Sequence, residues 1–104
     1  SRTDQMNFLL HMAVRSNLGD DTAQATVWLE RLLAVNPSSI PAFAQLGAVA
    51  RRLGDCPRAI AHWTQARQLL EARADPENVV YRTGRHVDDQ LEALARSIAK
   101  CRER

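Results

Sequence analysis

Large and small apolar residues recur in the same order twice along the chain, at a spacing of 34 residues. Residues 40–73 have their counterpart in residues 6–39, and the register holds without a gap. The matched pairs include Leu9 with Phe43, Ala13 with Gly47, Ala25 with Ala59 and Leu29 with Trp63. A repeat of this length is typical of stacked helix hairpins.

Residues that start and stop helices agree with this register. Asp21 and Gln24 have the form of a capping box, whereas Asn36–Pro37 interrupts a helix. Gly19 and Gly54 are expected to end helices. Four helices are therefore predicted near 4–18, 21–35, 40–53 and 56–72, with N-caps at Asp21, Ser39 and Asp55.

Small residues stand where the two helices of one unit must cross closely. These are Ala13 and Ala25 in the first unit, and Gly47 and Ala59 in the second. A large side chain at these positions would force the helices apart. Neither helix pair buries its apolar face alone, so the sequence predicts that the two pairs stack.

The 34-residue period fails after residue 73. Residues 74–87 are predicted to form a loop, with Val79, Val80 and Tyr81 folding back onto the core. Helical spacing returns in residues 88–102, where apolar positions at i, i+3 and i+4 form one stripe and charged residues lie elsewhere. The stripe consists of Leu91, Leu94, Ala95, Ile98 and Cys101. This segment is predicted to be a capping helix; the alternative is a helix that continues into further repeats.

Composition fits this picture and narrows the function. The 104 residues allow one small domain, and the abundance of helix formers over Val and Ile predicts an all-α fold. Fourteen basic residues against twelve acidic ones give a formal charge of +2, too balanced to imply a polyanionic partner. No apolar run approaches the roughly 20 residues of a transmembrane helix, so direct membrane insertion is not expected.

No constellation of residues points to catalysis, a metal or a cofactor. His11, His62 and His86 share no metal-ligand spacing with the cysteines. The acidic pairs Asp20–Asp21 and Asp88–Asp89 lie at expected helix starts, where carboxylates complement the helix dipole. The protein is therefore expected not to be an enzyme.

The second unit resembles the tetratricopeptide-repeat (TPR) family closely. Phe43 stands at a preferred aromatic position, Leu46–Gly47 matches the family's Leu-Gly pair, and three later residues match its small–aromatic–small positions, namely Ala59, Trp63 and Ala66. The first unit is more degenerate, although Pro37 matches the terminal proline. The resemblance implies two TPR hairpins, residues 6–39 and 40–73, stacked in a right-handed superhelix before the capping helix.

The resemblance also implies a function, because the first helix of each TPR lines a concave groove that binds a peptide or helix of a partner protein. The groove residues that it implies here are Asn7, Leu10, Val14, Asn17, Pro41, Ala44, Ala48, Arg51 and Arg52. These are mostly small and apolar, unlike the family's carboxylate clamp. An apolar strip with arginines at one end suits an amphipathic helix or an acidic-ended segment. The alternative is that Arg51 and Arg52 are ordinary solvated charges.

Two other functions remain open. The exposed end faces of a short repeat stack can pair, which would make the chain a homo-oligomerising assembly module. Some helical repeats bind nucleic acid, for which the candidate cations are Arg51, Arg52, Arg58 and Arg67. That function is less expected, since the basic face lacks aromatic residues for base stacking.

The two cysteines have two interpretations. A cap helix in a TPR stack runs antiparallel to the helix before it, which brings Cys56 and Cys101 to the same end. A disulfide between them would favour an oxidising compartment such as the periplasm over the cytoplasm. The alternative is two unrelated thiols, with Cys101 buried as a small apolar residue.

A narrower resemblance links the chain to the periplasmic TPR domains of bacterial cytochrome c maturation factors. It is carried by a helix that bears a tryptophan and by a Leu-rich cap. The shared residues are Ala59, Ile60, Trp63, Leu94, Ser97, Ile98 and Ala99.

Overall fold

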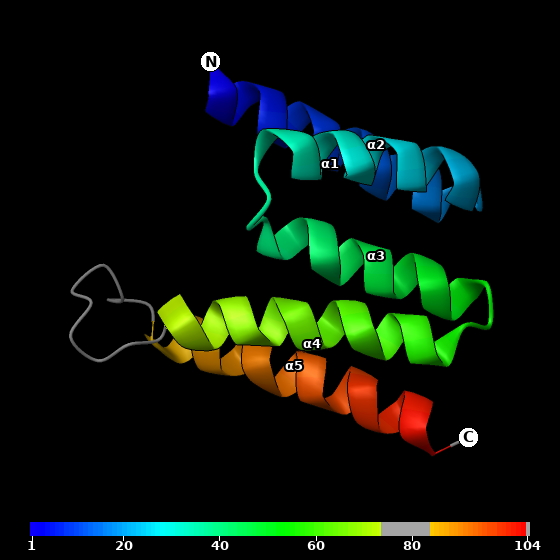
Figure 1. The fold of residues 1–104 in the computed structure, drawn as a ribbon, viewed down its shortest axis with the longest axis vertical. Coiled ribbons are helices and arrows are strands. Elements are labelled where there is room, and N and C mark those ends of the chain that lie inside the picture. Colours follow the sequence, from blue (N-terminus) through cyan, green and yellow to red (C-terminus); the bar gives the residue numbers. More distant parts are fainter. Residues whose placement is uncertain (74–83, 104) are drawn as a thin grey trace.

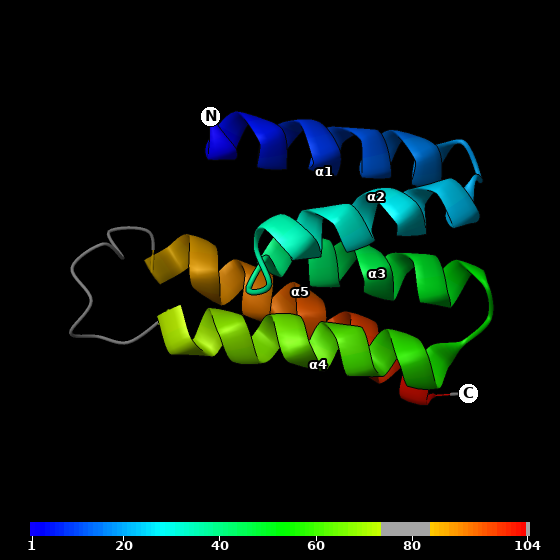
Figure 2. The same cartoon turned by 45° about the horizontal axis from the view of Figure 1, so that its top comes forward.

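A computed structural model gives the backbone of residues 1–73 and 84–103, with side chains for 1–72 and 89–103. These residues fold as an all-α domain. The helices are α1 (Arg2–Leu18), α2 (Thr22–Val35), α3 (Ile40–Arg52), α4 (Cys56–Arg73) and α5 (Gly84–Arg102). Each helix packs against the one before it and runs in the opposite direction, and α3 also contacts α1 (Figures 1 and 2).

The predicted helices correspond to α1–α4, whereas α5 begins earlier than the sequence indicated. Residues 84–87 were expected to belong to the loop, but the helix already starts at Gly84. These residues contain no proline, and glycine is well tolerated at a helix start, so nothing there blocks the first turn. Val79, Val80 and Tyr81, expected to fold back onto the core, lie outside the described residues.

The three predicted N-caps are present, and each provides an oxygen for a backbone amide of the first turn. The carboxylate of Asp21 accepts from the amide of Gln24 at 3.1 Å, and that of Asp55 accepts from the amide of Arg58 at 3.1 Å. The Ser39 hydroxyl accepts from the amide of Ala42 at 3.3 Å. Such a cap typically stabilises a helix by about 1 kcal/mol.

The turns that join the helices of each pair have the same geometry 34 residues apart. Asp20 and Gly54 both adopt positive φ, at 63° and 79°. The next amide, of Asp21 or Asp55, donates to a carbonyl five residues earlier, at 2.9 Å in both turns. In the first turn the left-handed residue is therefore Asp20 and not Gly19, whose φ is −85°. Aspartate tolerates this conformation better than most residues that carry a side chain.

Buried side chains form two cores that share α3. The first core lies between α1, α2 and one face of α3 and contains Leu9, Ala13, Ala25, Leu29, Leu32, Ala42 and Val49. The second core lies between α3, α4 and α5 and contains Ile40, Ala50, Ala59, Trp63, Ala66, Leu70, Leu94, Ile98 and Cys101. The small residues predicted at the helix crossings, at positions 13, 25, 47 and 59, are all buried.

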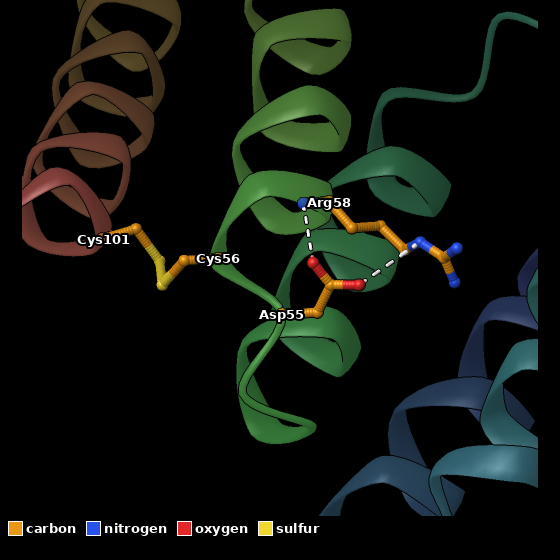
Figure 3. Close-up of a disulfide and its surroundings, with 4 residues drawn as sticks. All are labelled: Asp55, Cys56, Arg58 and Cys101. Atoms are coloured by element: carbon orange, nitrogen blue, oxygen red, sulfur yellow. Dashed lines mark hydrogen bonds and ion pairs between the residues drawn. A yellow bond between two sulfur atoms is a disulfide. The ribbon is translucent and has the colours of Figure 1, made fainter. Parts of the chain in front are cut away.

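A disulfide between Cys56 and Cys101 joins the first turn of α4 to the last turn of α5, with the Cα atoms 5.4 Å apart (Figure 3). Beside it, Asp55 caps α4 and also pairs with the Arg58 guanidinium at 3.6 Å. The antiparallel course of α4 and α5 brings the two cysteines together. Cys101 is itself part of the second core, so the disulfide fastens α5 at the end opposite to its connection with α4.

Candidate binding groove

An open groove of about 800 Å³ crosses the face of the molecule where α3, α4 and α5 meet. In Figure 1, α4 lies between α3 and α5. Trp63 and Leu70 of α4 are buried and form the floor of the groove, whereas α3 and α5 supply its walls. The complete lining is Asn17, Ile40, Pro41, Ala44, Ala48, Arg51, Arg52, Trp63, Leu70, Gln90, Ala93, Leu94 and Ser97.

Small apolar residues make most of the groove shallow and smooth. Ala44 and Ala48 stand one turn apart on α3, and Ala93 lies on the facing helix. Because these side chains end at Cβ, a second backbone can approach closely while its larger side chains reach the floor. Pro41 and Leu94 extend the apolar surface.

The floor is held in place by a close fit between Gly47 and Trp63. The indole nitrogen of Trp63 donates to the carbonyl of Ala44 at 3.2 Å, which fixes the ring under α3. A Cβ at residue 47 would overlap this ring. The missing side chain of Gly47 therefore sets the position of the largest side chain in the groove.

One end of the groove is polar. It is formed by Asn17 at the end of α1 and by Arg51 and Arg52 in the last turn of α3. The α3 dipole favours cations at this position, which explains the arginines locally without any ligand. Arg52 is paired with Asp20, whereas Arg51 forms no ion pair with any residue that the structure describes.

Asn17 is unusual because its side chain is buried without a matching donor. Only 8% of its surface is exposed, and its Oδ1 atom has no hydrogen-bond partner among the described residues. Buried polar atoms in folded proteins are nearly always paired, so the unpaired Oδ1 atom of a residue that lines the groove requires an explanation.

The groove includes some of the residues that the sequence pointed to and leaves out others. Asn17, Pro41, Ala44, Ala48, Arg51 and Arg52 line it. Asn7 is exposed elsewhere on α1, and Leu10 packs against the first core. Val14 is half-buried and does not line the groove. The first three turns of α1 lie along the α1–α2 hairpin, so only the end of α1 reaches the groove.

Sequence reasoning missed the contributions of α4 and α5. Trp63 was assigned to the core, and it does lie there, but it also faces the groove. On α5 the lining residues Gln90, Ala93, Leu94 and Ser97 stand at i, i+3, i+4 and i+7. That spacing marks one face of a helix and was visible in the sequence, beside the apolar stripe that packs on α4.

No group of three metal-ligand side chains occurs among the described residues. His62 stacks on Phe43 with ring centroids 6.4 Å apart, outside the groove. Partial burial, together with the nearby Arg58 cation, lowers the pKa of His62 below its usual value and so favours the neutral imidazole.

Within the described residues, no helix has the combination of length and apolar character that crossing a bilayer requires. Comparisons of the chain with protein families, with curated proteins and with solved structures find no significant match.

Proposed function

We propose that this chain is a non-catalytic TPR-type scaffold that binds a peptide or helix of a partner protein in the groove between α3 and α5. The observation that carries the proposal is the groove itself: an apolar channel with one polar end, built from four helices and open to solvent. Binding sites of this kind are concave and mostly apolar, with a few polar groups that fix the orientation of the ligand.

The assignment to the TPR class draws its support from the repeat geometry. The left-handed turn residues Asp20 and Gly54, the caps Asp21 and Asp55, and the crossing residues Ala13 and Gly47 each recur after 34 residues. Repeats that stack two helices per unit present the first helices of successive units on one face. In this chain that face carries α3 and the end of α1, which both contribute to the groove.

A helix is the occupant that the shape of the groove favours. From residue 40 to residue 51, α3 extends about 16 Å at about 1.5 Å per residue, which matches three turns of a bound helix. The described residues include no strand edge to which an extended peptide could add by backbone pairing. Alanines on both walls permit the close approach of two helices.

The test is to block the groove. Helical peptides selected for binding to the intact chain are expected to bind Ala48→Arg at least tenfold more weakly, because the new side chain fills the channel. Ala61→Arg makes the same change at an exposed position of α4 and is expected to leave affinity unchanged. Fluorescence anisotropy measures binding, and circular dichroism checks that both variants fold. Equal affinity for Ala48→Arg and the wild type would remove the groove as the site.

A further inference from the structure

The polar end of the groove specifies the chemistry and the direction of the bound helix. We infer that the occupant is an amphipathic helix with an acidic first turn, and that this N-terminal turn lies at Asn17 and Arg51. This inference rests on the proposed function and adds the partner's charge and orientation to it.

Two unmet interactions belong to residues that line this end of the groove. The Asn17 Oδ1 atom is a buried acceptor that lacks a donor among the described residues. Arg51 is a cation without an anionic partner in the same set, since Asp20 is engaged by Arg52. No acidic side chain lines the groove in the described parts of the chain. A ligand that completes this end must therefore bring both a hydrogen-bond donor and a negative charge.

The N-terminal end of a helix brings both without depending on donor side chains. The first four backbone N–H groups of a helix have no partner within it, and acidic side chains are favoured in the same turn. The interior of a helix has no free N–H. The C-terminal turn presents carbonyl oxygens, which would face the Asn17 Oδ1 atom acceptor to acceptor. A terminal carboxylate there would satisfy Arg51 but leave Asn17 without a donor.

This placement is consistent with the directions of the surrounding helices. The last turn of α3 lies at the polar end of the groove, and α5 runs in the same direction as α3 (Figures 1 and 2). A helix that begins at this end runs antiparallel to both walls. Its positive N-terminal dipole then meets the negative C-terminal end of α3, and its acidic residues meet Arg51.

The experiment compares two synthetic peptides of identical composition, each three to four turns long, with the same Leu-rich face. One carries an Asp–Glu pair in its first turn and the other carries it in its last turn. Both are acetylated and amidated, so that no terminal charge contributes. We expect the peptide with the acidic first turn to bind the oxidised, full-length chain at least tenfold more tightly by fluorescence anisotropy.

Variants of the protein test whether Arg51 and Asn17 cause the preference for the peptide with the acidic first turn. Arg51→Gln is expected to reduce the tenfold preference to less than threefold. Arg15→Gln changes another exposed arginine, near the end of α1, that does not line the groove, and it should leave the preference intact. Asn17→Leu removes the acceptor and should weaken binding of the acidic-first peptide. Arg51 is exposed, so its variant remains informative if replacement of the buried Asn17 unfolds the chain.

The outcomes separate the inference from the proposed function. Equal affinity of the two peptides, or tighter binding of the peptide with the acidic last turn, overturns the inferred orientation and leaves groove binding standing. An unchanged preference in Arg51→Gln also overturns the inference. A proline in the middle of the acidic-first peptide should abolish its binding, and undiminished binding would contradict a helical occupant. If neither peptide binds at any accessible concentration, the proposed function fails with the inference.

Discussion

Gly47 and Trp63 illustrate how a single residue type decides the packing of two helices. In the first unit the corresponding positions hold Ala13 and Leu29. In the second unit both residues differ in size: position 47 has no side chain, and the indole ring of Trp63 occupies the space where a Cβ would stand. The larger ring of the second unit therefore requires the smaller residue opposite it.

Gly47→Ala is expected to destabilise the protein despite the better helix propensity of alanine. Overpacking against Trp63 costs about 1–3 kcal/mol, whereas replacing a helical glycine gains up to about 1 kcal/mol. Urea denaturation measures the net loss. The variant Gly47→Ala with Trp63→Leu recreates the pair of the first unit, so we expect it to be more stable than the sum of the two single changes implies. Strict additivity would show that the ring and the glycine do not constrain each other.

For single residues, the sequence predicted the small side chains where α1 crosses α2 and where α3 crosses α4, because the 34-residue register aligns small residues with small ones. It did not predict the left-handed residue of the first turn. Gly19 was expected to end the first helix, and it does, whereas the left-handed residue that follows it is Asp20. The 34-residue register could have identified Asp20 as the left-handed residue, because Gly54 aligns with Asp20 and not with Gly19.

Among the helices, α5 is attached to α4 by a disulfide as well as by packing. It packs on α4 through Leu94, Ile98 and Cys101, and it forms one wall of the groove. The sequence predicts its amphipathic stripe, but the predicted start lies four residues too late, because a glycine at position 84 favours a loop over a helix. Periodicity identifies the buried face of a helix far better than it identifies the first turn.

Reduction of the disulfide is expected to weaken the attachment of α5. In the chain-entropy model, a closed loop with a sequence separation of 45 residues corresponds to roughly 4 kcal/mol of stability. Thermal denaturation with and without a dithiol reductant measures the loss. The variant Cys56→Ser with Cys101→Ser should unfold at the lower temperature in both conditions. A reductant effect of equal size in this variant would show that the disulfide is not its cause.

The whole molecule is a slab with extents of 41 × 40 × 18 Å, so it is only about two helix layers thick. In the described residues its two cores share α3. The disulfide lies entirely on the side of the second core. The sequence predicted that the two helix pairs stack. It did not indicate that α4 and α5 complete the groove, because the TPR resemblance implies groove residues only from the first helix of each repeat.

The presence of two cores predicts that a substitution in one core lowers the stability of the helices around that core more than the stability of the others. Leu29 is fully buried in the first core, so Leu29→Ala is expected to cost about 2–5 kcal/mol. Native-state hydrogen exchange should accelerate mainly in α1 and α2, while α4 and α5 remain protected. Leu70→Ala in the second core is the matched control and should show the reverse pattern. A uniform acceleration across all five described helices would indicate one cooperative unit instead of two.

The disulfide has a further consequence when the chain is pulled from its two ends. Tension applied there passes directly from Cys56 to Cys101 through the sulfur atoms and bypasses the 45-residue span between them. At ~3.3–3.6 Å per residue, about 150 Å of contour length stays hidden while the bond is intact. In a force–extension measurement the fully extended oxidised chain is therefore shorter than the reduced chain by that length. Because α5 lies almost entirely within the bypassed span, this wall of the groove bears no load while the disulfide is intact.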